Sequence, residues 1–407
     1  MKFLRVRGLL LLVIPAAMAI SACDGQGKPE PAATGDSSAT AAGGAGAEEP
    51  MIQPDSSAIA GTPQPMTGVN ADSARKALAA MKRDSIPLIR YTAFHIADKS
   101  AMDSIRRRFG RRDDNMAAHR ALITLNRKEF GYIRIGDTIV VPDSVSSDLR
   151  DYAVFPQRYH GGDTIRKLVM ISNALQSYAC YEYGYLVRFA ACNTGTESKA
   201  TFPGRYAMNW KERLRTSSLN ENWKLPYNWN FHLYAGNAFH QFAMPGRPVS
   251  HSCVRQFMSD AEWLFNWGEG GRRDSNNIMI PLTGTPVIII DMFDFNRKKG
   301  GPWLELASNH DGIVSLPDAP MGVEEALIPI SQVPSAVRGG LKDRARYEGA
   351  EKILRERGII RPEARLSPSI DYNKLRGGKK ATKPPVKRRK AAAAPAATPT
   401  VSNIGGE

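Results

Sequence analysis

The pattern of apolar and polar residues predicts that folded structure begins near Ile86. A strand is expected first, and apolar residues then recur at the spacing of one helix face: Met102, Ile105 and Phe109. A second short helix is expected at residues 116–125. The stretch 132–142 is rich in β-forming residues, contains a Gly-Asp turn and ends at a proline. This segment is therefore predicted to fold in the order strand, helix, helix, strand.

Beyond residue 160 the pattern changes to short apolar runs separated by turn residues, which is typical of a mainly β domain. The expected strands are residues 167–171, 178–182, 185–192, 204–210, 230–242 and 286–291. Tyr183 and Gly184 suit a tight turn between the second and third of them. Helical content should be minor in this domain, and a charged helix is expected afterwards at residues 341–357.

The N-terminus has the features of an export signal. Basic residues precede the apolar run 9–19, which is shorter than a membrane-spanning helix requires. The following Ile20-Ser21-Ala22-Cys23 resembles the lipobox of bacterial lipoproteins, which implies lipidation of Cys23. An ordinary signal peptide is the alternative. In both cases the mature chain is expected to work outside the cytoplasm, in the cell envelope.

Composition narrows the possible partners. The 407 residues include 42% hydrophobic positions, enough for a full core, while no further run is long enough for a polytopic membrane protein. Lys and Arg outnumber Asp and Glu by 55 to 40, and basic residues gather in the tail 376–407. Because an exported protein meets little nucleic acid, nucleic acid is not expected as a partner. Anionic envelope polymers are the possible partners of the tail, and a solvated tail without a partner is the alternative.

Two of the four cysteines, Cys180 and Cys192, lie on the strands that flank the Tyr183-Gly184 turn. In a regular hairpin position 180 would face about position 186, so position 192 lies beyond the reach of a disulfide. Two buried thiols are therefore predicted.

The segment from His240 to Arg255 contains the candidate chemistry. If residues 250–255 are extended, alternation places His251, Cys253 and Arg255 on one face. A thiol becomes a good nucleophile beside an imidazole and a cation, and the imidazole also transfers protons. Taken singly, a buried cysteine and a core histidine would be the ordinary interpretation.

A zinc site formed by His240, His251 and Cys253 is a further alternative, because three ligands would leave one coordination position for water. The His-x-Cys pair is a tight bite for tetrahedral geometry, and no acidic residue adjoins these ligands as a general base. We therefore assign no metal and no cofactor.

Several motifs together resemble the L,D-transpeptidase (YkuD) catalytic domain over roughly residues 166–292. They are Asn193-Thr194-Gly195, Pro203-Gly204-Arg205-Tyr206, Leu225-Pro226-Tyr227, His240, Gly246-x-Pro248-Val249-Ser250-His251-x-Cys253-Val254-Arg255 and Gly284-Thr285-Pro286-Val287. The resemblance implies a YkuD-type β-sandwich and a cysteine transpeptidase acting on peptidoglycan stem peptides. The stem would be held as a thioester until an amine of a second stem attacks it.

The resemblance also implies a role for each site residue. Cys253 would be the nucleophile, His251 the general base and later acid, Arg255 an ordering residue, and His240 part of the opposite wall. Backbone N–H groups near Ser252 and Cys253 would meet the oxyanion. Two further residues, Ser250 and Tyr227, are assigned to the substrate and oxyanion side.

This sequence departs from the family pattern at two positions. Ser252 and Gln241 stand where the family has glycine. If the turn at Ser252 needs a positive φ, its Cβ costs about 1 kcal/mol. Gln241 is expected to narrow the acceptor side of the site.

The segment 90–143 resembles a LysM module, which implies binding to glycan strands of peptidoglycan; a structural subdomain is the alternative. The chain is thus divided into a lipoprotein signal peptide (1–22), a flexible linker (23–85), a LysM-like module (86–145), a catalytic domain (160–295), a partly helical extension (296–375) and a basic disordered tail (376–407). The expected function is peptidoglycan cross-linking. An L,D-carboxypeptidase, attachment of protein to peptidoglycan, and a non-catalytic membrane-to-wall tether are the alternatives.

Overall fold

The computed structural model describes residues 86–297 and 300–373, together with Ser73 and Lys76. The predicted signal peptide (1–22), Cys23, nearly all of the linker (23–85) and the basic tail (376–407) lie outside these residues. None of the described helices has the length and apolar character needed to cross a membrane.

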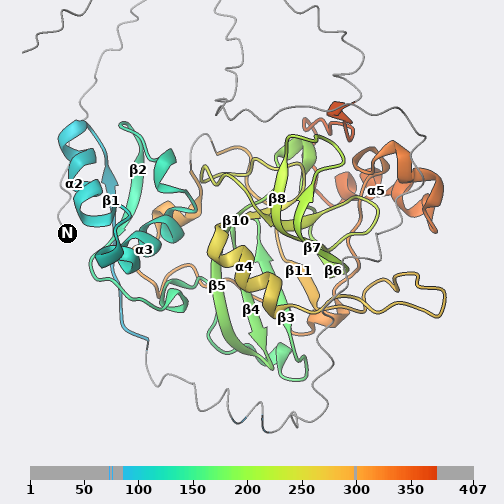
Figure 1. The fold of residues 1–407 in the computed structure, drawn as a ribbon, viewed down its shortest axis with the longest axis horizontal. Coiled ribbons are helices and arrows are strands. Elements are labelled where there is room, and N and C mark those ends of the chain that lie inside the picture. The colour runs from blue at the N-terminus through green and yellow to red at the C-terminus, as the bar shows by residue number, and fades with distance from the viewer. Residues whose placement is uncertain (1–72, 74–75, 77–85, 298–299, 374–407) are drawn as a thin grey trace, which may run out of the picture. The chain divides into compact units, whose positions relative to one another are not determined.

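The first folded segment has the predicted order of elements. It consists of β1 (Tyr91–His95), α2 (Lys99–Phe109), α3 (Met116–Asn126) and β2 (Thr138–Pro142), and the two strands pair antiparallel (Figure 1). Helix α2 buries Met102, Ile105 and Phe109, the residues that its periodicity singled out. Its N-terminus is capped by the Asp98 carboxylate, which accepts a hydrogen bond from the Ala101 amide.

The larger part of the chain forms one curled, mixed sheet in the order β6-β11-β3-β4-β5-β10-β9-β8-β7, which confirms the mainly β prediction (Figure 1). The strands are β3 (Leu168–Ser172), β4 (Ser177–Glu182), β5 (Tyr185–Asn193), β6 (Gly204–Ala207), β7 (Lys211–Thr216), β8 (Lys224–Asn230), β9 (Ala238–Gln241), β10 (Val254–Gln256) and β11 (Pro286–Ile289). Two pairs are parallel, β11 with β3 and β10 with β9.

Both faces of the central strands are buried, so these strands are almost continuously apolar. All five residues of β3 are buried. Val169 and Ile171 belong to one hydrophobic core, and Leu168 and Met170 belong to another on the opposite face. The first core includes residues of α5 (Arg344–Glu356), close to the predicted charged helix. The second core includes residues of the β1–β2 segment.

The β4–β5 hairpin turns at Tyr183 and Gly184, as predicted. Their φ angles of 46° and 75° suit the tight turns that match strand twist. A register shift between Cys180 and Tyr181 places Cys180 opposite Arg188. The regular pairing expected from the sequence, with Cys180 opposite about position 186, is therefore wrong, because it did not include this irregularity. Cys180 and Cys192 are buried free thiols, which confirms the prediction made for them.

The sequence pattern did not reveal three elements beside the site: β7, β8 and α4. Strands β7 and β8 form an antiparallel hairpin, and β7 is largely exposed, so it carries little hydrophobic alternation. Helix α4 (Met258–Trp267) packs against β8 and β9. The strand predicted at residues 204–210 ends at Ala207. The strand predicted at residues 230–242 is interrupted, because the chain between β8 and β9 turns at residues 231–237.

The buried side chain of Arg127 joins the β1–β2 segment to the sheet. Arg127 ends α3 in the left-handed conformation, with φ 52°. Its guanidinium donates to the carbonyl oxygens of Leu175, Thr124 and Leu125 at 2.9–3.0 Å. It also lies 5.8 Å from the Phe189 ring centroid and 5.6 Å from that of Trp303. The charge thus faces carbonyl oxygens and aromatic rings, while its buried Nη2 has no hydrogen-bond partner among the described residues.

Replacing Arg127 should therefore destabilise this junction. We expect Arg127→Ala to lower the free energy of unfolding by about 3 kcal/mol, because three carbonyl oxygens lose the guanidinium as a donor and a cavity remains. Urea unfolding would measure the loss, with Arg111→Ala as the control because Arg111 is exposed. A change in the Arg127 variant no larger than that in the control would contradict this account.

Candidate active site

The sheet register places three of the predicted site residues near one another. Cys253 directly precedes β10, which lies between β5 and β9. Arg255 and His240 are register partners in the parallel β10–β9 pair, so their side chains share one face of the sheet. Val254 and Phe239 point to the opposite face, into the hydrophobic core.

The Cys253 sulfur lies against the chain that leads into β9. The Ala238 amide donates a hydrogen bond to the sulfur, and the thiol lies 4.0 Å from the Gly236 carbonyl oxygen. Burial raises the pKa of the Cys253 thiol, while the Ala238 amide and the Arg255 charge act in the opposite direction. These two groups would stabilise the thiolate once a base removes the proton.

The residue before the cysteine, Ser252, has a left-handed backbone with φ 81°. The expectation that residues 250–255 are extended throughout is therefore wrong, because the backbone takes a left-handed turn at Ser252 before β10 begins at Val254. The Ser252 carbonyl oxygen accepts hydrogen bonds from Thr201 Oγ1 at 3.0 Å and from Asn237 Nδ2 at 3.2 Å. The turn is thus held from both sides, and it sets the direction of His251 relative to Cys253.

His240 on β9 is a buried imidazole, only 4% exposed. Its Nδ1 lies 3.0 Å from the Gln241 carbonyl oxygen. Burial lowers the pKa of His240 to about 4, and the Arg255 charge acts in the same direction. Because a carbonyl oxygen only accepts, Nδ1 carries the proton and Nε2 keeps its lone pair.

His251 is held by aromatic residues that the sequence did not single out. Its Nε2 lies 3.0 Å from the Tyr372 hydroxyl, and its ring centroid lies 5.2 Å from that of Trp223. Burial lowers the pKa of His251 to about 4, assisted by the charges of Lys199 and Arg255. No local motif indicates Tyr372, which follows His251 by 121 positions.

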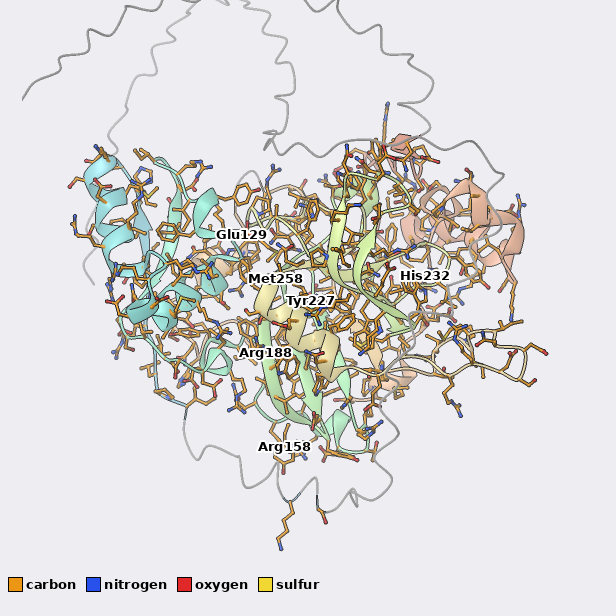
Figure 2. The ribbon with its side chains drawn as sticks, viewed as in Figure 1. Glu129, Arg158, Arg188, Tyr227, His232 and Met258 are labelled. Atoms are coloured by element: carbon orange, nitrogen blue, oxygen red, sulfur yellow. The ribbon has the colours of Figure 1, made fainter. Side chains whose placement is uncertain are left out.

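Arg255 fastens the neighbouring loop and interacts with the β1–β2 segment. Its Nη1 donates to the Ala243 carbonyl oxygen at 3.1 Å, and its guanidinium lies 4.7 Å from the Phe242 ring centroid. Its charge also opposes the rise in pKa that burial causes at Glu129, which is labelled in Figure 2. These contacts suit the ordering role expected for Arg255.

Ser250 and Tyr227 were both predicted on the substrate and oxyanion side. The Ser250 hydroxyl donates to the Cys253 carbonyl oxygen, and its amide donates to the Thr194 carbonyl oxygen at 3.0 Å. Ser250 therefore closes the loop that carries the cysteine. Tyr227 instead lies beside α4, where its hydroxyl donates to Glu262 at 2.7 Å and its ring packs on Phe265 (Figure 2). Tyr227 therefore contacts residues of α4, and neither of these two contacts is with Cys253.

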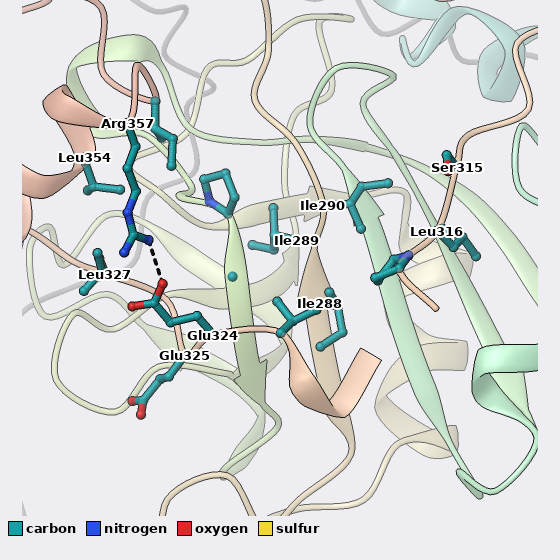
Figure 3. Close-up of a pocket in the computed structure, with 15 residues that line it drawn as sticks. Ile288, Ile289, Ile290, Ser315, Leu316, Glu324, Glu325, Leu327, Leu354 and Arg357 are labelled. Carbon is teal, nitrogen blue, oxygen red and sulfur yellow. Dashed lines mark hydrogen bonds and ion pairs between the residues drawn. The ribbon is translucent and has the colours of Figure 1, made fainter. Parts of the chain in front are cut away.

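Two other features of the described residues bear on the choice of site. Within those residues, His240, His251 and Cys253 belong to no group of three or more His, Cys, Asp or Glu placed to hold a metal ion. A cavity of about 420 Å³ lies beside β11, next to the Glu324–Arg357 ion pair (Figure 3). None of the predicted site residues lines that cavity.

The left-handed turn predicts an unusual response to substitution at Ser252. Ser252→Gly should be more stable than Ser252→Ala by about 1 kcal/mol, because both variants lose the hydroxyl and only alanine keeps a Cβ at positive φ. Thermal or urea unfolding of the two variants would measure the difference. Equal stability would show that the turn carries no strain from the side chain.

Comparison with known proteins shows what this region is similar to. Residues 166–289 match the family model of the L,D-transpeptidase (YkuD) catalytic domain. A search of curated proteins found no significant match.

Solved L,D-transpeptidases also match. One solved in complex with imipenem shares 17% identity with a TM-score of 0.25, and the match covers 31% of this chain and 59% of that one. An enzyme from Stackebrandtia nassauensis shares 18% identity with a TM-score of 0.28, covering 54% of this chain and 89% of that one. One from Xylanimonas cellulosilytica shares 21% identity with a TM-score of 0.30, covering 51% and 100%. Over residues 166–289 this chain is thus similar to the L,D-transpeptidase (YkuD) catalytic domain.

Proposed function

We propose that this protein is a peptidoglycan L,D-transpeptidase that forms stem-peptide cross-links through a thioester on Cys253. The observation that carries the proposal is the setting of the thiol within the matched domain. The Ala238 amide donates to the sulfur, the Arg255 charge favours the thiolate, and the neutral imidazole of His240 shares a face of the sheet with Arg255.

The proposed reaction has two acyl transfers. In the first, Cys253 loses its proton to an imidazole and attacks the carbonyl carbon that precedes the terminal D-alanine of a stem peptide. The C–N bond breaks, the D-alanine amine takes the proton, and a thioester forms. In the second, an amine of another stem attacks the thioester, the C–S bond breaks, and the thiol recovers its proton. Backbone N–H groups near Ser252 and Cys253 are proposed to stabilise the oxyanion in both steps.

The hydrogen bonds favour His240 as the base, although the sequence pattern assigned that role to His251. The Gln241 carbonyl oxygen fixes the tautomer of His240 and leaves the lone pair on Nε2. The Tyr372 hydroxyl both donates and accepts, so it does not fix the tautomer of His251. We therefore propose that His240 accepts the thiol proton and that His251 lines the substrate side.

The parts outside the catalytic domain suggest where the enzyme would work. A LysM-like module that contacts glycan strands, a lipid on Cys23 and a basic tail that attracts anionic polymers would hold the enzyme in the cell envelope, between membrane and wall.

With water as acceptor, the same thioester would make the protein an L,D-carboxypeptidase. With a protein lysine as acceptor, it would attach protein to peptidoglycan. A non-catalytic tether is the alternative from another class.

The thioester mechanism predicts a covalent adduct on one cysteine. Incubation of the purified chain with a carbapenem should add the mass of one carbapenem, because opening of the β-lactam ring acylates the thiol without a leaving group. Imipenem is a suitable probe, since a matched L,D-transpeptidase was solved in complex with it. Intact mass spectrometry should show the adduct on the unaltered chain and on Cys180→Ala, and no adduct on Cys253→Ala.

Muropeptide products would then distinguish the activities. Tetrapeptide muropeptides should give dimers with the unaltered chain and none with Cys253→Ala. Tripeptide products alone would indicate a carboxypeptidase. Failure of the unaltered chain to form either the adduct or a product would support the non-catalytic tether.

The choice of base predicts different effects for the two histidines. His240→Gln should slow acylation of Cys253 by about 100-fold, the ordinary contribution of a general base, and His251→Gln by about tenfold. Because burial lowers the pKa of His240 to about 4, the base stays deprotonated down to that pH. The acidic limb of the acylation rate should therefore fall near pH 4 and not near pH 6.5. A larger loss in His251→Gln than in His240→Gln would return the base role to His251.

A further inference from the structure

The C-terminal segment Ser367–Asn373, here called the strap, follows the matched domain in sequence but lies against it. Three of its backbone amides donate to carbonyl oxygens elsewhere in the fold, each at 2.8 Å: Ser367 to Ser198, Ser369 to Ser331 and Tyr372 to Leu219. The strap thus follows a defined path from the loop that holds Ser198 to the loop between β7 and β8.

Tyr372 brings the strap into contact with the active site. Its hydroxyl lies 3.0 Å from His251 Nε2. Trp223, immediately before β8, lies beside both rings, with centroid distances of 5.2 Å to His251 and 5.4 Å to Tyr372. The Tyr372 and His251 rings meet edge to face at 5.8 Å. The imidazole is therefore held by a hydrogen bond and by two aromatic rings.

A second contact connects the strap to a cation beside His251. Lys199, which ends the short helix Glu197–Lys199, donates from Nζ to the Pro368 carbonyl oxygen at 2.8 Å. The charges of Lys199 and Arg255 both lower the pKa of His251, and the Tyr372 hydroxyl is the hydrogen-bond partner of His251. Two of these three groups, Lys199 and Tyr372, are thus held by or belong to the strap.

We propose that Tyr372 is a positioning residue, which holds the imidazole of His251 in the orientation that the substrate meets. The strap is thereby a working part of the active site although it lies outside residues 166–289. With Nε2 occupied by Tyr372, only Nδ1 of His251 remains to contact a substrate. The kinetic consequence of this inference rests on the proposed transpeptidase function. The contact between Tyr372 and His251 does not depend on that function.

The variant that isolates the hydrogen bond is Tyr372→Phe, which removes the hydroxyl and keeps the ring beside Trp223 and His251. Tyr347→Phe is the matched control. Tyr347 lies on α5, in the same C-terminal extension, and its ring packs on His232 and Tyr234 at 6.1 and 6.2 Å. Both variants lose one phenol hydroxyl, and only Tyr372 contacts His251.

The first measurement needs no substrate. In the full chain labelled with ¹⁵N-histidine, the imidazole nitrogens of His251 should shift in Tyr372→Phe and should titrate at a different pH, while those of His240 stay unchanged. Assignment would come from loss of the signal in His251→Gln. Tyr347→Phe should leave His251 unchanged. Unchanged His251 resonances in Tyr372→Phe would overturn the proposal, whether or not the protein is a transpeptidase.

The second measurement is the rate of stem-peptide turnover. Tyr372→Phe should raise KM about fivefold with kcat within about twofold, because an interaction made in both the ground state and the transition state is lost. In a His251→Gln background the same substitution should add less than about a twofold change, since the residue through which Tyr372 acts is gone. Independent, multiplicative effects would overturn the positioning role.

Faster turnover in Tyr372→Phe would also overturn it, because the strap would then obstruct the site and not support it. If the unaltered chain shows no turnover, the proposed function fails, and the histidine resonances still decide whether Tyr372 positions His251.

Discussion

The buried amide of Asn193 is the contact on which the arrangement of the active site depends. Its Nδ2 donates to the Arg127 carbonyl oxygen, and its Oδ1 accepts from the Gly246 amide, each at 3.0 Å. Asn193 is also the register partner of Arg255 on β10. One fully buried side chain thus joins the end of α3, the loop that leads to Cys253, and the strand that follows it. Because its hydrogen-bonding groups are buried, breaking either bond would leave a polar group unsatisfied.

The electrostatic setting of the site follows from burial near cations. His240 and His251 each have a pKa lowered to about 4, chiefly by burial; neighbouring positive charge also lowers both, while the hydrogen bond to Gln241 acts in the opposite direction on His240. At neutral pH both imidazoles are therefore uncharged, and the thiol, whose pKa burial raises, is protonated. The nucleophile would be generated by proton transfer within the site, after which the Ala238 amide and Arg255 stabilise the sulfur charge.

Segments on both sides of the catalytic domain complete this setting. The β1–β2 segment contributes the Arg127 and Glu129 contacts, and the strap contributes Tyr372 and the Pro368 carbonyl oxygen that holds Lys199. The matched residues 166–289 contain Cys253, His240 and His251. The hydrogen-bond partners of His251 Nε2 and Lys199 Nζ come from beyond residue 366, so residues 166–289 alone do not complete the candidate active site.

The sequence by itself determined the elements whose hydrophobic pattern is strong and the residues whose motif is local. Helices α2 and α3 were predicted because apolar residues recur at helical spacing, and strands β3 to β5 because they are short, almost continuously apolar runs bounded by turn residues. Strand β7 was missed because it is largely exposed. The tertiary structure alone decided the positive φ at Ser252, the fixed tautomer of His240 and the hold of Tyr372 on His251. The physical reason is that these features depend on hydrogen-bond partners and on a left-handed turn, which periodicity does not record, and that Tyr372 lies 121 positions from His251 in the sequence.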